Sequence, residues 1–351
     1  MTLNIKFVYN IIMDYKYFEN KVIFLAEKSN LYYFTKLKNN DAYIIFIGNE
    51  KFYFTDERYF EDANTNLIDY KICNIKELEN FIQKNNITIL GIEDSLPQYL
   101  YQKLINAGIN KTFSVTDHIN QIRSVKSFEE IELIKKAQEI TDKTFNHILN
   151  TIKEGITETE LACILESSLY ANGADELAFS SIVAFAENTS KPHAIRTNKK
   201  LTNNSLITLD FGAKYRGYCS DMTRTIAFGN ILDEQKKIYN HVLTAQNLAL
   251  DIVHSKMTGK ECDTISRKYF EEHKLNKYFI HSLGHGVGLD IHEHPRLSQS
   301  SNTVLTENMV VTIEPGLYFE KKFGIRIEDL IIFDKTSIIN LTKSPKNIII
   351  L

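Results

Sequence analysis

Apolar and polar positions alternate in short runs over roughly the first 120 residues, a pattern that favours β-strands separated by helices. Helices are expected near 76–85 and within 97–108, on either side of a strand at 87–93. The polar GNE sequence between the last two of the aromatic-rich runs predicts a hairpin. This order of elements indicates a small α/β domain. The strand-forming runs are VIFLA (22–26), LYYFT (31–35), AYIIFIG (42–48) and KFYFTD (51–56).

The rest of the chain opens with the pattern of a long amphipathic helix. Ser127 and Glu130 fit an S-x-x-E capping box at its start. A second box, Thr157 with Glu160, predicts another helix that ends at Gly173. Further helices are expected at about 233–253 and 260–273, and strand-rich blocks at 205–228 and 304–334.

The change of pattern near 121–126 divides the chain. Neither repeats nor low-complexity segments are present. We therefore expect an α/β (α+β) protein with a small domain at 1–122 and a larger one at 123–351.

Composition and charge argue against a nucleic-acid-binding or membrane-spanning protein. The 351 residues are 43% hydrophobic and 24% charged with a formal net charge of -3, which is typical of a soluble globular protein. No nucleic-acid partner is expected, because phosphate binding needs clustered Lys and Arg. No apolar run approaches the roughly 20 residues that span a bilayer, and the scattered cysteines form no C-x-x-C pair. We expect a cytoplasmic protein with reduced thiols and no membrane partner.

Two predicted hairpins each bring a pair of acidic residues together. The block 205–228 predicts a hairpin whose symmetry point lies between Tyr215 and Arg216. Asp210 and Asp221 would then face each other with their Cβ atoms about 5 Å apart. Two carboxylates among apolar neighbours repel each other and are poorly solvated. A positive charge between them is therefore expected.

The block 304–334 repeats this arrangement. A hairpin centred on Lys321 places Glu314 opposite Glu328. Pro315 predicts an edge or bulge beside them, because proline cannot donate a ladder hydrogen bond. Either pair alone has an ordinary explanation, since the register can differ and the side chains can face solvent. Two pairs with a histidine-rich stretch between them favour divalent cations.

The number and type of acids point to a particular kind of metal site. Carboxylates combined with imidazole favour a hard or intermediate ion. Four acids exceed the need of one catalytic ion, whereas two ions about 3.5 to 4 Å apart can share bridging carboxylates. We expect two divalent metal ions, Mn²⁺ ahead of Co²⁺, Fe²⁺ or Zn²⁺.

The stretch HSLGHGVGLDIHEHP (281–295) holds four of the ten histidines. His281 and His285 have the spacing of one helix face, but three glycines argue against a helix and suggest a backbone close to an ion or substrate. The H-E-x-x-H zinc motif is absent. The neighbouring acids make His285 a candidate ligand, and His281 and His292 weaker candidates.

Together these segments resemble the proline-specific metallopeptidases, aminopeptidase P and prolidase. The resemblance implies a creatinase-like N-terminal domain and a catalytic domain of the pita-bread fold, in a protein that usually forms a homodimer. It covers nearly the whole chain. Its motifs are LDFGAKYRGYCSDMTRT, HSLGHGVGLDIHE, TIEPGLY and GIRIED, with FTDERYFEDA (54–63), IRSVKSFEEIELIKKA (122–137) and SKPHAIR (190–196) similar to the N-terminal domain, the connecting helix and a histidine-bearing segment of the family.

The resemblance also implies roles for single residues. Asp210 would bind one ion, while Asp221 and Glu328 would contact both. His285 and Glu314 would complete the second ion, and Glu314 is the expected general base. The remaining expected site residues are His193, His281 and His292, which would line the substrate pocket and steady the tetrahedral intermediate, Arg326, which would support the centre, and Arg296, a candidate partner for a proline carboxylate.

The expected reaction is hydrolysis of proline-containing peptides or dipeptides after the first residue. We expect an Xaa-Pro aminopeptidase, with an Xaa-Pro dipeptidase (prolidase) as the alternative. Creatinase-like enzymes and non-enzymatic pita-bread proteins generally lack the five ligands, and methionine aminopeptidases do not need the extra N-terminal domain. A serine hydrolase is disfavoured because no G-x-S-x-G motif is present.

Overall fold

A computed structural model describes residues 17–18, 20–38 and 41–351. The chain divides into two compact units, Met1–Arg123 and Ser124–Leu351. Within the described residues, no helix combines the length and apolar content needed to span a bilayer.

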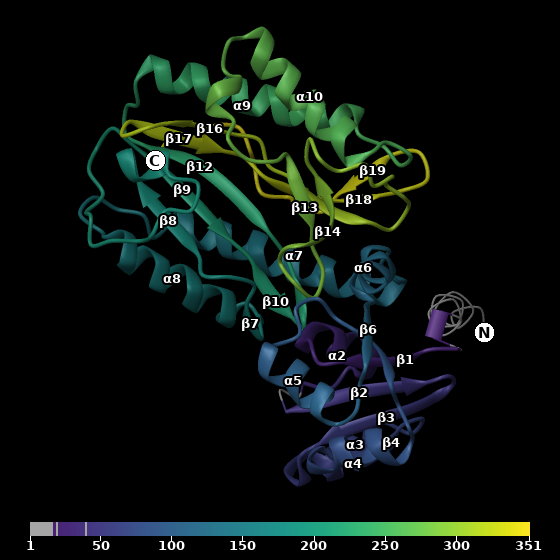
Figure 1. Cartoon of the computed structure of the whole chain (residues 1–351). Coiled ribbons are helices and arrows are strands. Elements are labelled where there is room, and N and C mark those ends of the chain that lie inside the picture. The colour runs from purple at the N-terminus through teal and green to yellow at the C-terminus, as the bar shows by residue number, and fades with distance from the viewer. Residues whose placement is uncertain (1–16, 19, 39–40) are drawn as a thin grey trace, which may run out of the picture. The chain divides into compact units, whose positions relative to one another are not determined.

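The first unit is built on a mixed sheet of order β4-β3-β2-β1-β5-β6 (Figure 1). Successive side chains of a strand point to opposite faces of the sheet. Helices cover both faces, so neighbouring residues of one strand enter two different cores. Ile23 and Leu25 join a core with α2, α3 and α6, whereas Phe24 joins a core with α4 and α5. The elements are β1 (Val22–Leu25), α2 (Lys28–Thr35), β2 (Ala42–Ile47), β3 (Glu50–Thr55), α3 (Phe60–Asn66), β4 (Lys71–Asn74), α4 (Leu78–Lys84), β5 (Ile89–Ile92), α5 (Gln98–Asn106), β6 (Lys111–Ser114) and α6 (Thr116–Ser124).

Most of the local predictions for this unit are confirmed. The expected hairpin is β2–β3, closed by a two-residue turn in which Gly48 has a φ of 56°. The LYYFT run is different, because it lies in helix α2 and not in a strand. Its buried positions, Leu31 and Thr35, are four residues apart, so burial of one helix face outweighs the β propensity of the aromatic residues.

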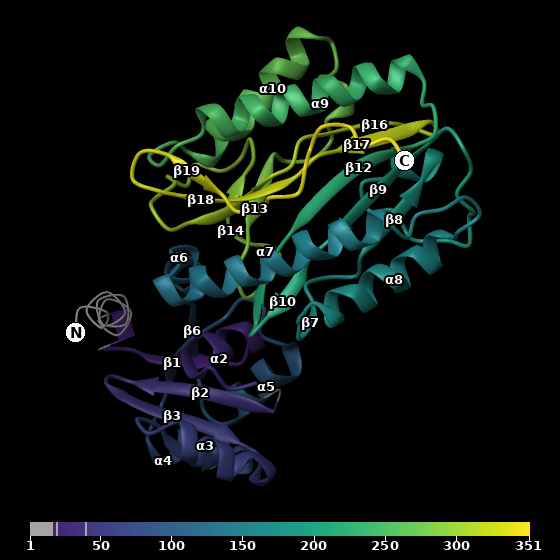
Figure 2. The same ribbon diagram turned by 180° about the vertical axis from the view of Figure 1, so that it is seen from behind.

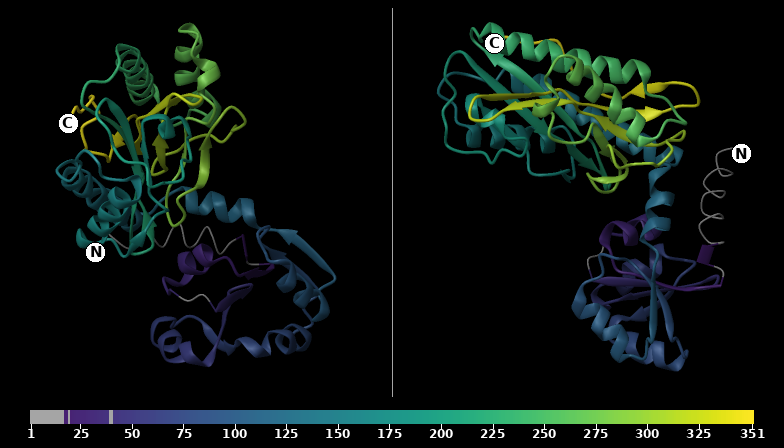
Figure 3. Two further views of the ribbon diagram at one scale, coloured as in Figure 1. Left: turned by 90° about the vertical axis from the view of Figure 1, so that its left-hand side faces the viewer. Right: turned by 45° about the horizontal axis from the view of Figure 1, so that its top comes forward.

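The second unit has two helical layers with strands between them. α7 and α8 pack on β8, β9 and β12, and Figure 2 shows these helices in front of β9 and β12. α9 and α10 pack on β15 to β18, and Figure 3 shows both helices at one side of the unit in each view. The first elements are α7 (Phe128–Leu149), α8 (Glu158–Ala171), β7 (Glu176–Leu177), β8 (Ile182–Phe185), the 3-10 helix η3 (Ala186–Ser190), β9 (Ser205–Phe211), β10 (Ala213–Tyr215), β11 (Tyr218–Cys219) and β12 (Met222–Phe228). The later elements are α9 (Asp233–Ile252), α10 (Gly259–Glu272), η4 (Asn276–Tyr278), β13 (Gly284–Gly286), β14 (Glu293–Leu297), β15 (Val310–Ile313), β16 (Gly316–Phe319), β17 (Phe323–Arg326), β18 (Asp329–Phe333) and β19 (Ile338–Asn340).

Both predicted capping boxes are present at the starts of α7 and α8. Ser127 Oγ accepts from the backbone N–H of Glu130, and the Glu130 carboxylate accepts from the backbone N–H of Ser127. Thr157 and Glu160 make the same pair of bonds. These reciprocal bonds satisfy N–H groups that have no partner within the helix, so the sequence marks both helix starts correctly.

Candidate metal centre

The turn between β10 and β11 sets the positions of Asp210 and Asp221. Asp210 lies opposite Thr223 on β12, so the predicted direct pairing of Asp210 with Asp221 is wrong by two residues. The turn is centred one position later than expected, because Arg216 and Gly217 both have positive φ, 45° and 85°, as in a two-residue type I′ turn. A shift of two residues preserves the face of the strand. Both acids therefore still line the same cavity.

The second hairpin has the predicted register. Ile313 pairs with Asp329 and Gly316 pairs with Arg326, so Glu314 and Glu328 lie opposite each other between these two pairs. The ladder is interrupted beside them, because β15 ends before Pro315 and β16 begins after it. The predicted pairing of the two glutamates and the predicted irregularity are both confirmed.

His285 lies on the short strand β13, which pairs with β14 and β15. The sequence suggested that the neighbouring glycines bring the backbone close to an ion or substrate. In the structure they allow β13 to lie close to its neighbouring strands. A Cβ atom on Gly284 would lie 2.0 Å from the backbone oxygen of Thr312 on β15, and one on Gly286 would lie 2.3 Å from the backbone oxygen of His294. Glycine is therefore needed here for close approach of protein backbones, and this approach holds His285 beside the acids.

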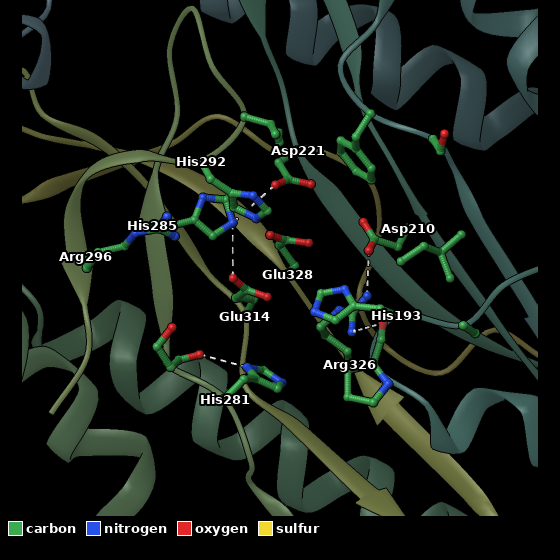
Figure 4. Close-up of a pocket in the computed structure, with 17 residues that line it drawn as sticks. His193, Asp210, Asp221, His281, His285, His292, Arg296, Glu314, Arg326 and Glu328 are labelled. Carbon is green, nitrogen blue, oxygen red and sulfur yellow. Dashed lines mark hydrogen bonds and ion pairs between the residues drawn. The ribbon is translucent and has the colours of Figure 1, made fainter. Parts of the chain in front are cut away.

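The five expected ligands line one cavity of about 650 Å³ and point toward one another (Figure 4). His285 Nε2 lies 3.6 Å from Asp221 Oδ2 and 3.3 Å from Glu314 Oε1. Asp221, His285 and Glu328 each offer one ligand atom, and these atoms lie within 4.8 Å of one another. All the other expected site residues also line this cavity: His193, His281, His292, Arg296 and Arg326.

The electrostatics of the cavity suit a bound cation. Burial, reinforced by the neighbouring carboxylates, raises the pKa values of Asp221 and Glu328 well above their usual range. Burial also raises the pKa of Glu314 to about 7. Burial lowers the pKa of His285 to about 3, which keeps this imidazole in the neutral form that binds metals. The clustered acids cannot all ionise unless a positive charge enters between them.

Asp210 provides an independent test of this fit. Its Oδ2 accepts a 2.6 Å hydrogen bond from Arg326 Nη2. Its Oδ1 is buried and, within the described part of the chain, has no hydrogen-bond partner. A buried carboxylate oxygen is normally satisfied by a donor or a cation. The donor set of carboxylates and neutral imidazole therefore fits divalent ions.

A hydrogen-bond network beside the acids includes Tyr318, which the sequence reasoning missed. Tyr318 Oη accepts from Arg326 Nη1 at 2.7 Å and lies 3.1 Å from His281 Nε2. The backbone oxygen of Ser282 beside His281 Nδ1 can only accept, so Nδ1 carries the proton of the neutral ring and Nε2 accepts from the Tyr318 O–H. The alternation of Glu314, Gly316 and Tyr318 along the TIEPGLY motif is the signal that could have placed Tyr318 on the site face.

The same network occupies both ring nitrogens of His281. Its Nδ1 lies 2.8 Å from the backbone oxygen of Ser282, to which an Nδ1–H donates. Burial, together with the charge of Arg326, lowers the pKa of His281 to about 4, so the ring is neutral. In this arrangement His281 has no free N–H for a substrate oxyanion. His193 and His292, which are exposed in the cavity, are better placed to donate.

Two family models match the chain. Metallopeptidase family M24 matches residues 132–335, and the Creatinase/Prolidase N-terminal domain matches residues 19–125. A protein named Xaa-Pro dipeptidase from Pyrococcus furiosus is 38% identical over 337 residues, which cover 94% of this chain and 96% of that protein.

Solved structures give the same result. The Xaa-Pro dipeptidase from Bacillus anthracis has a TM-score of 0.94 and 35% identity, covering 98% of this chain and 99% of that one. The X-Pro aminopeptidase from Thermotoga maritima has a TM-score of 0.88 and 32% identity, covering 97% of this chain and all of that one. The expected creatinase-like N-terminal domain and pita-bread catalytic domain are confirmed. The chain belongs to metallopeptidase family M24, whose hydrolases use divalent metal ions.

Proposed function

We propose that the protein is an Xaa-Pro dipeptidase that hydrolyses the bond between a first residue and a C-terminal proline. The clustering of four carboxylates, three of them buried and Glu314 partly exposed, with a neutral imidazole in one cavity is the observation that carries the metal-dependent hydrolysis. The choice of dipeptidase over the aminopeptidase expected from the sequence is supported by the similarity to Xaa-Pro dipeptidases over nearly the whole chain. An Xaa-Pro aminopeptidase is the second candidate, favoured by the similarity to the Thermotoga maritima enzyme.

The proposed ligands of two divalent ions, Mn²⁺ first among them, are Asp210, Asp221, His285, Glu314 and Glu328. When bound, the ions would lower the pKa of a water molecule and polarise the scissile carbonyl. The charge that they bring also removes the repulsion among these carboxylates.

Glu314 is the proposed general base. Its Oε1 accepts from Thr312 Oγ1 at 3.3 Å, which orients the carboxylate and leaves Oε2 for a proton. Oε2 can take the proton of the attacking water and pass it to the leaving nitrogen of proline. His193 and His292 are the proposed donors to the developing oxyanion, because both are exposed in the cavity.

Arg296 is the proposed partner of the proline carboxylate. It lines the cavity and is exposed there, beside His292 (Figure 4). A guanidinium can bind a carboxylate through two parallel hydrogen bonds. In a dipeptide the carboxylate belongs to proline itself, whereas in a longer peptide it lies one or more residues further away. Loss of Arg296 is therefore expected to slow hydrolysis of a dipeptide more than hydrolysis of a longer peptide.

The test compares Gly-Pro with Gly-Pro-Ala, using protein that has been stripped by a chelator and reloaded with Mn²⁺. We expect faster hydrolysis of the dipeptide, and only background hydrolysis for Asp221→Asn or His285→Ala. Arg296→Met should lower kcat/KM for Gly-Pro about tenfold to a hundredfold, the loss expected for a charged hydrogen-bond pair. Cleavage of the tripeptide at an equal or higher rate would favour the aminopeptidase. Full activity after exhaustive chelation would overturn the metal assignment.

The cytoplasmic location and the homodimer expected from the sequence are also proposals. Analytical ultracentrifugation of the purified chain, giving twice the mass of one chain, would support the dimer.

A further inference from the structure

The segment 186–197, which we call the His193 loop, is tied at both ends to a carboxylate outside the cavity. Glu158, the first residue of α8, is fully buried. Its Oε1 accepts from the backbone N–H of Phe185 at 2.7 Å. Its Oε2 accepts from the backbone N–H and the Oγ1 of Thr197, at 2.8 and 2.7 Å. One side chain therefore joins the last residue before the loop to the last residue of the loop.

Asn188 extends this clamp into the loop. Its Nδ2 donates to both carboxylate oxygens of Glu158, at 3.0 and 3.1 Å. The same Nδ2 lies 3.3 Å from the backbone oxygen of Ile195, close to the far end of the loop. A buried carboxylate is tolerated only when its oxygens are satisfied by donors, and here the donors come from the loop and its flanks.

The middle of the loop enters the cavity. Pro192, His193 and Ala194 line it, and the backbone oxygen of Pro192 accepts from Arg326 Nη1 at 3.2 Å. Figure 4 shows His193 close to Arg326 and facing the acids.

Further contacts also hold the loop: Thr189 Oγ1 accepts from the backbone N–H of Gly324 at 2.9 Å, and Arg196 Nη1 lies 2.6 Å from Glu166 Oε1. Glu158 is the group that joins the two ends of the loop, and the path of the loop between those ends determines where His193 stands.

We propose that Glu158 is a positioning residue that holds His193 at the cavity. Glu158 contacts neither the cavity nor the candidate ligands, so it acts through the loop. The catalytic consequence rests on the proposed function, whereas the structural part, a loop held by Glu158, does not.

A double-mutant cycle tests the catalytic part. Glu158→Gln keeps the shape of the side chain but replaces one acceptor oxygen by an NH₂ donor. This donor would face the N–H of Phe185 or Thr197, so that hydrogen bond would be lost. We expect kcat/KM on Gly-Pro to fall about tenfold to a hundredfold, as for a small misplacement of a group in the site. In the His193→Ala background the same substitution should have no further effect, because the residue that it positions is gone. An equal further loss in that background would overturn the proposal.

Asp142 supplies a matched control. This buried carboxylate on α7 accepts from the backbone N–H groups of Lys343 and Ser344 and from Ser344 Oγ, so it also holds a distant segment through backbone donors. Asp142→Asn is the same acid-to-amide change without a connection to the His193 loop. We expect its effects on activity to add to those of His193→Ala. If Asp142→Asn also had no further effect in the His193→Ala background, general destabilisation would explain both results. That outcome would overturn the proposal.

A milder variant covers the case in which Glu158→Gln does not fold. Thr197→Val keeps the β-branched shape and removes only the Oγ1 donor to Glu158. The cycle with His193→Ala is then repeated with this variant, with a smaller expected loss in kcat/KM and the same absence of a further effect.

Hydrogen exchange separates the structural part from the proposed function. Amides within 188–197 should exchange faster in Glu158→Gln than in the wild-type protein, and at the wild-type rate in Asp142→Asn. Unchanged exchange in Glu158→Gln would refute the clamp whatever the enzyme cleaves. If the wild-type protein cleaves no Xaa-Pro substrate, the proposed function fails, and exchange alone decides whether Glu158 holds the loop.

Discussion

At the scale of single residues, the acids of the candidate centre are costly without a cation. In the metal-free protein, burial raises the pKa of Glu314 to about 7, and the pKa values of Asp221 and Glu328 rise well above their usual range. The folded metal-free protein therefore retains protons that the unfolded chain releases near pH 4.5. Stability is linked to pH through this difference in bound protons.

The first prediction concerns this linkage. Glu314 binds more proton in the folded than in the unfolded state from about pH 4.5 to 7, so its contribution lowers stability as pH rises through that window. His285, with a pKa lowered to about 3, acts in the opposite direction below pH 6.5. Above pH 6.5 the histidines with lowered pKa values contribute progressively less, whereas the acids continue to lower stability as pH rises. We expect the metal-free protein to have a lower Tm at pH 8 than at pH 6.5, measured by calorimetry.

Mn²⁺ and a variant provide the controls for this prediction. Mn²⁺ should raise the Tm more at pH 8 than at pH 6.5, because cations and protons compete for the same oxygens. Glu314→Gln should show a smaller fall in Tm between the two pH values. A metal-free Tm that rises over this interval would contradict the prediction.

Single residues of the site were predictable to different degrees. Glu314 and Glu328 follow from hairpin symmetry alone, because Lys321 lies at the true centre of that turn. The aspartates required knowledge of a two-residue turn with positive φ at Arg216, which a sequence does not reveal directly. For Tyr318, alternation along the strand could indicate the face but not the role, because that role depends on a hydrogen bond from Arg326 on another strand.

At the scale of elements, β13 depends on the close approach of three strands. Gly284→Ala would place a Cβ 2.0 Å from the backbone oxygen of Thr312, and a backbone atom cannot move aside as a flexible side chain can. We expect a loss of about 1–3 kcal/mol in unfolding free energy, measured by urea denaturation. Mn²⁺ affinity, measured by calorimetric titration, should also fall, because β13 carries His285. Wild-type Mn²⁺ affinity in this variant would show that the strand adapts without moving His285.

A buried ion pair holds β14 at its first residue, Glu293, near the end of the histidine-rich stretch. Lys126 Nζ lies 2.6 Å from Glu293 Oε1, and the two side chains are 1% and 7% exposed. Lys126→Met should lower the unfolding free energy by about 3–5 kcal/mol, because it leaves a buried carboxylate without its cation. The double variant Lys126→Met/Glu293→Gln should recover part of this loss in urea denaturation.

An exposed pair on α7 is the matched control for Lys126. Lys136 Nζ lies 3.1 Å from Glu139 Oε2, and the two side chains are 43% and 59% exposed. Lys136→Met should change the unfolding free energy by no more than about 0.5 kcal/mol, because exposed pairs contribute little. Equal losses for Lys126→Met and Lys136→Met would contradict the assignment of the buried pair.

Elements were predictable where local chemistry determines them. The starts of α7 and α8 follow from Ser127 and Thr157, whose capping bonds involve only neighbouring residues. The strands β13 and β14 were not anticipated, because glycine has low β propensity and these strands form only by pairing with each other and with β15. Helix α2 shows the converse, since tertiary burial overrides the β propensity of its aromatic residues.

At the scale of the whole molecule, each unit has its own hydrophobic cores. The described core clusters of the second unit draw on residues of 124–351 alone, and those of the first unit on residues before 124. All five candidate ligands belong to the second unit. We expect a fragment of residues 124–351 to fold and to gain Tm on addition of Mn²⁺, measured by circular dichroism. A fragment without a cooperative transition would show that the second unit needs the first.

The family was recognisable from the sequence because five ligands in a fixed order lie within long, specific motifs. The choice between dipeptidase and aminopeptidase was not, because it depends on the surroundings of a substrate carboxylate. Arg296 is suited to bind such a group, yet an arginine at this position does not by itself exclude longer peptides. The similarity to whole proteins named Xaa-Pro dipeptidase is what favours the dipeptidase.

The candidate ligands lie on or directly beside five separate strands, β9, β12, β13, β15 and β18, and are spread from residue 210 to residue 328. Long-range contacts of this kind form late in folding, after the intervening loops have closed. A cation that needs all five therefore cannot guide the early collapse of the chain. We therefore expect the chain to assemble its acids before it binds the ions, so that shortage of metal lowers the lifetime of folded molecules more than the rate at which they fold.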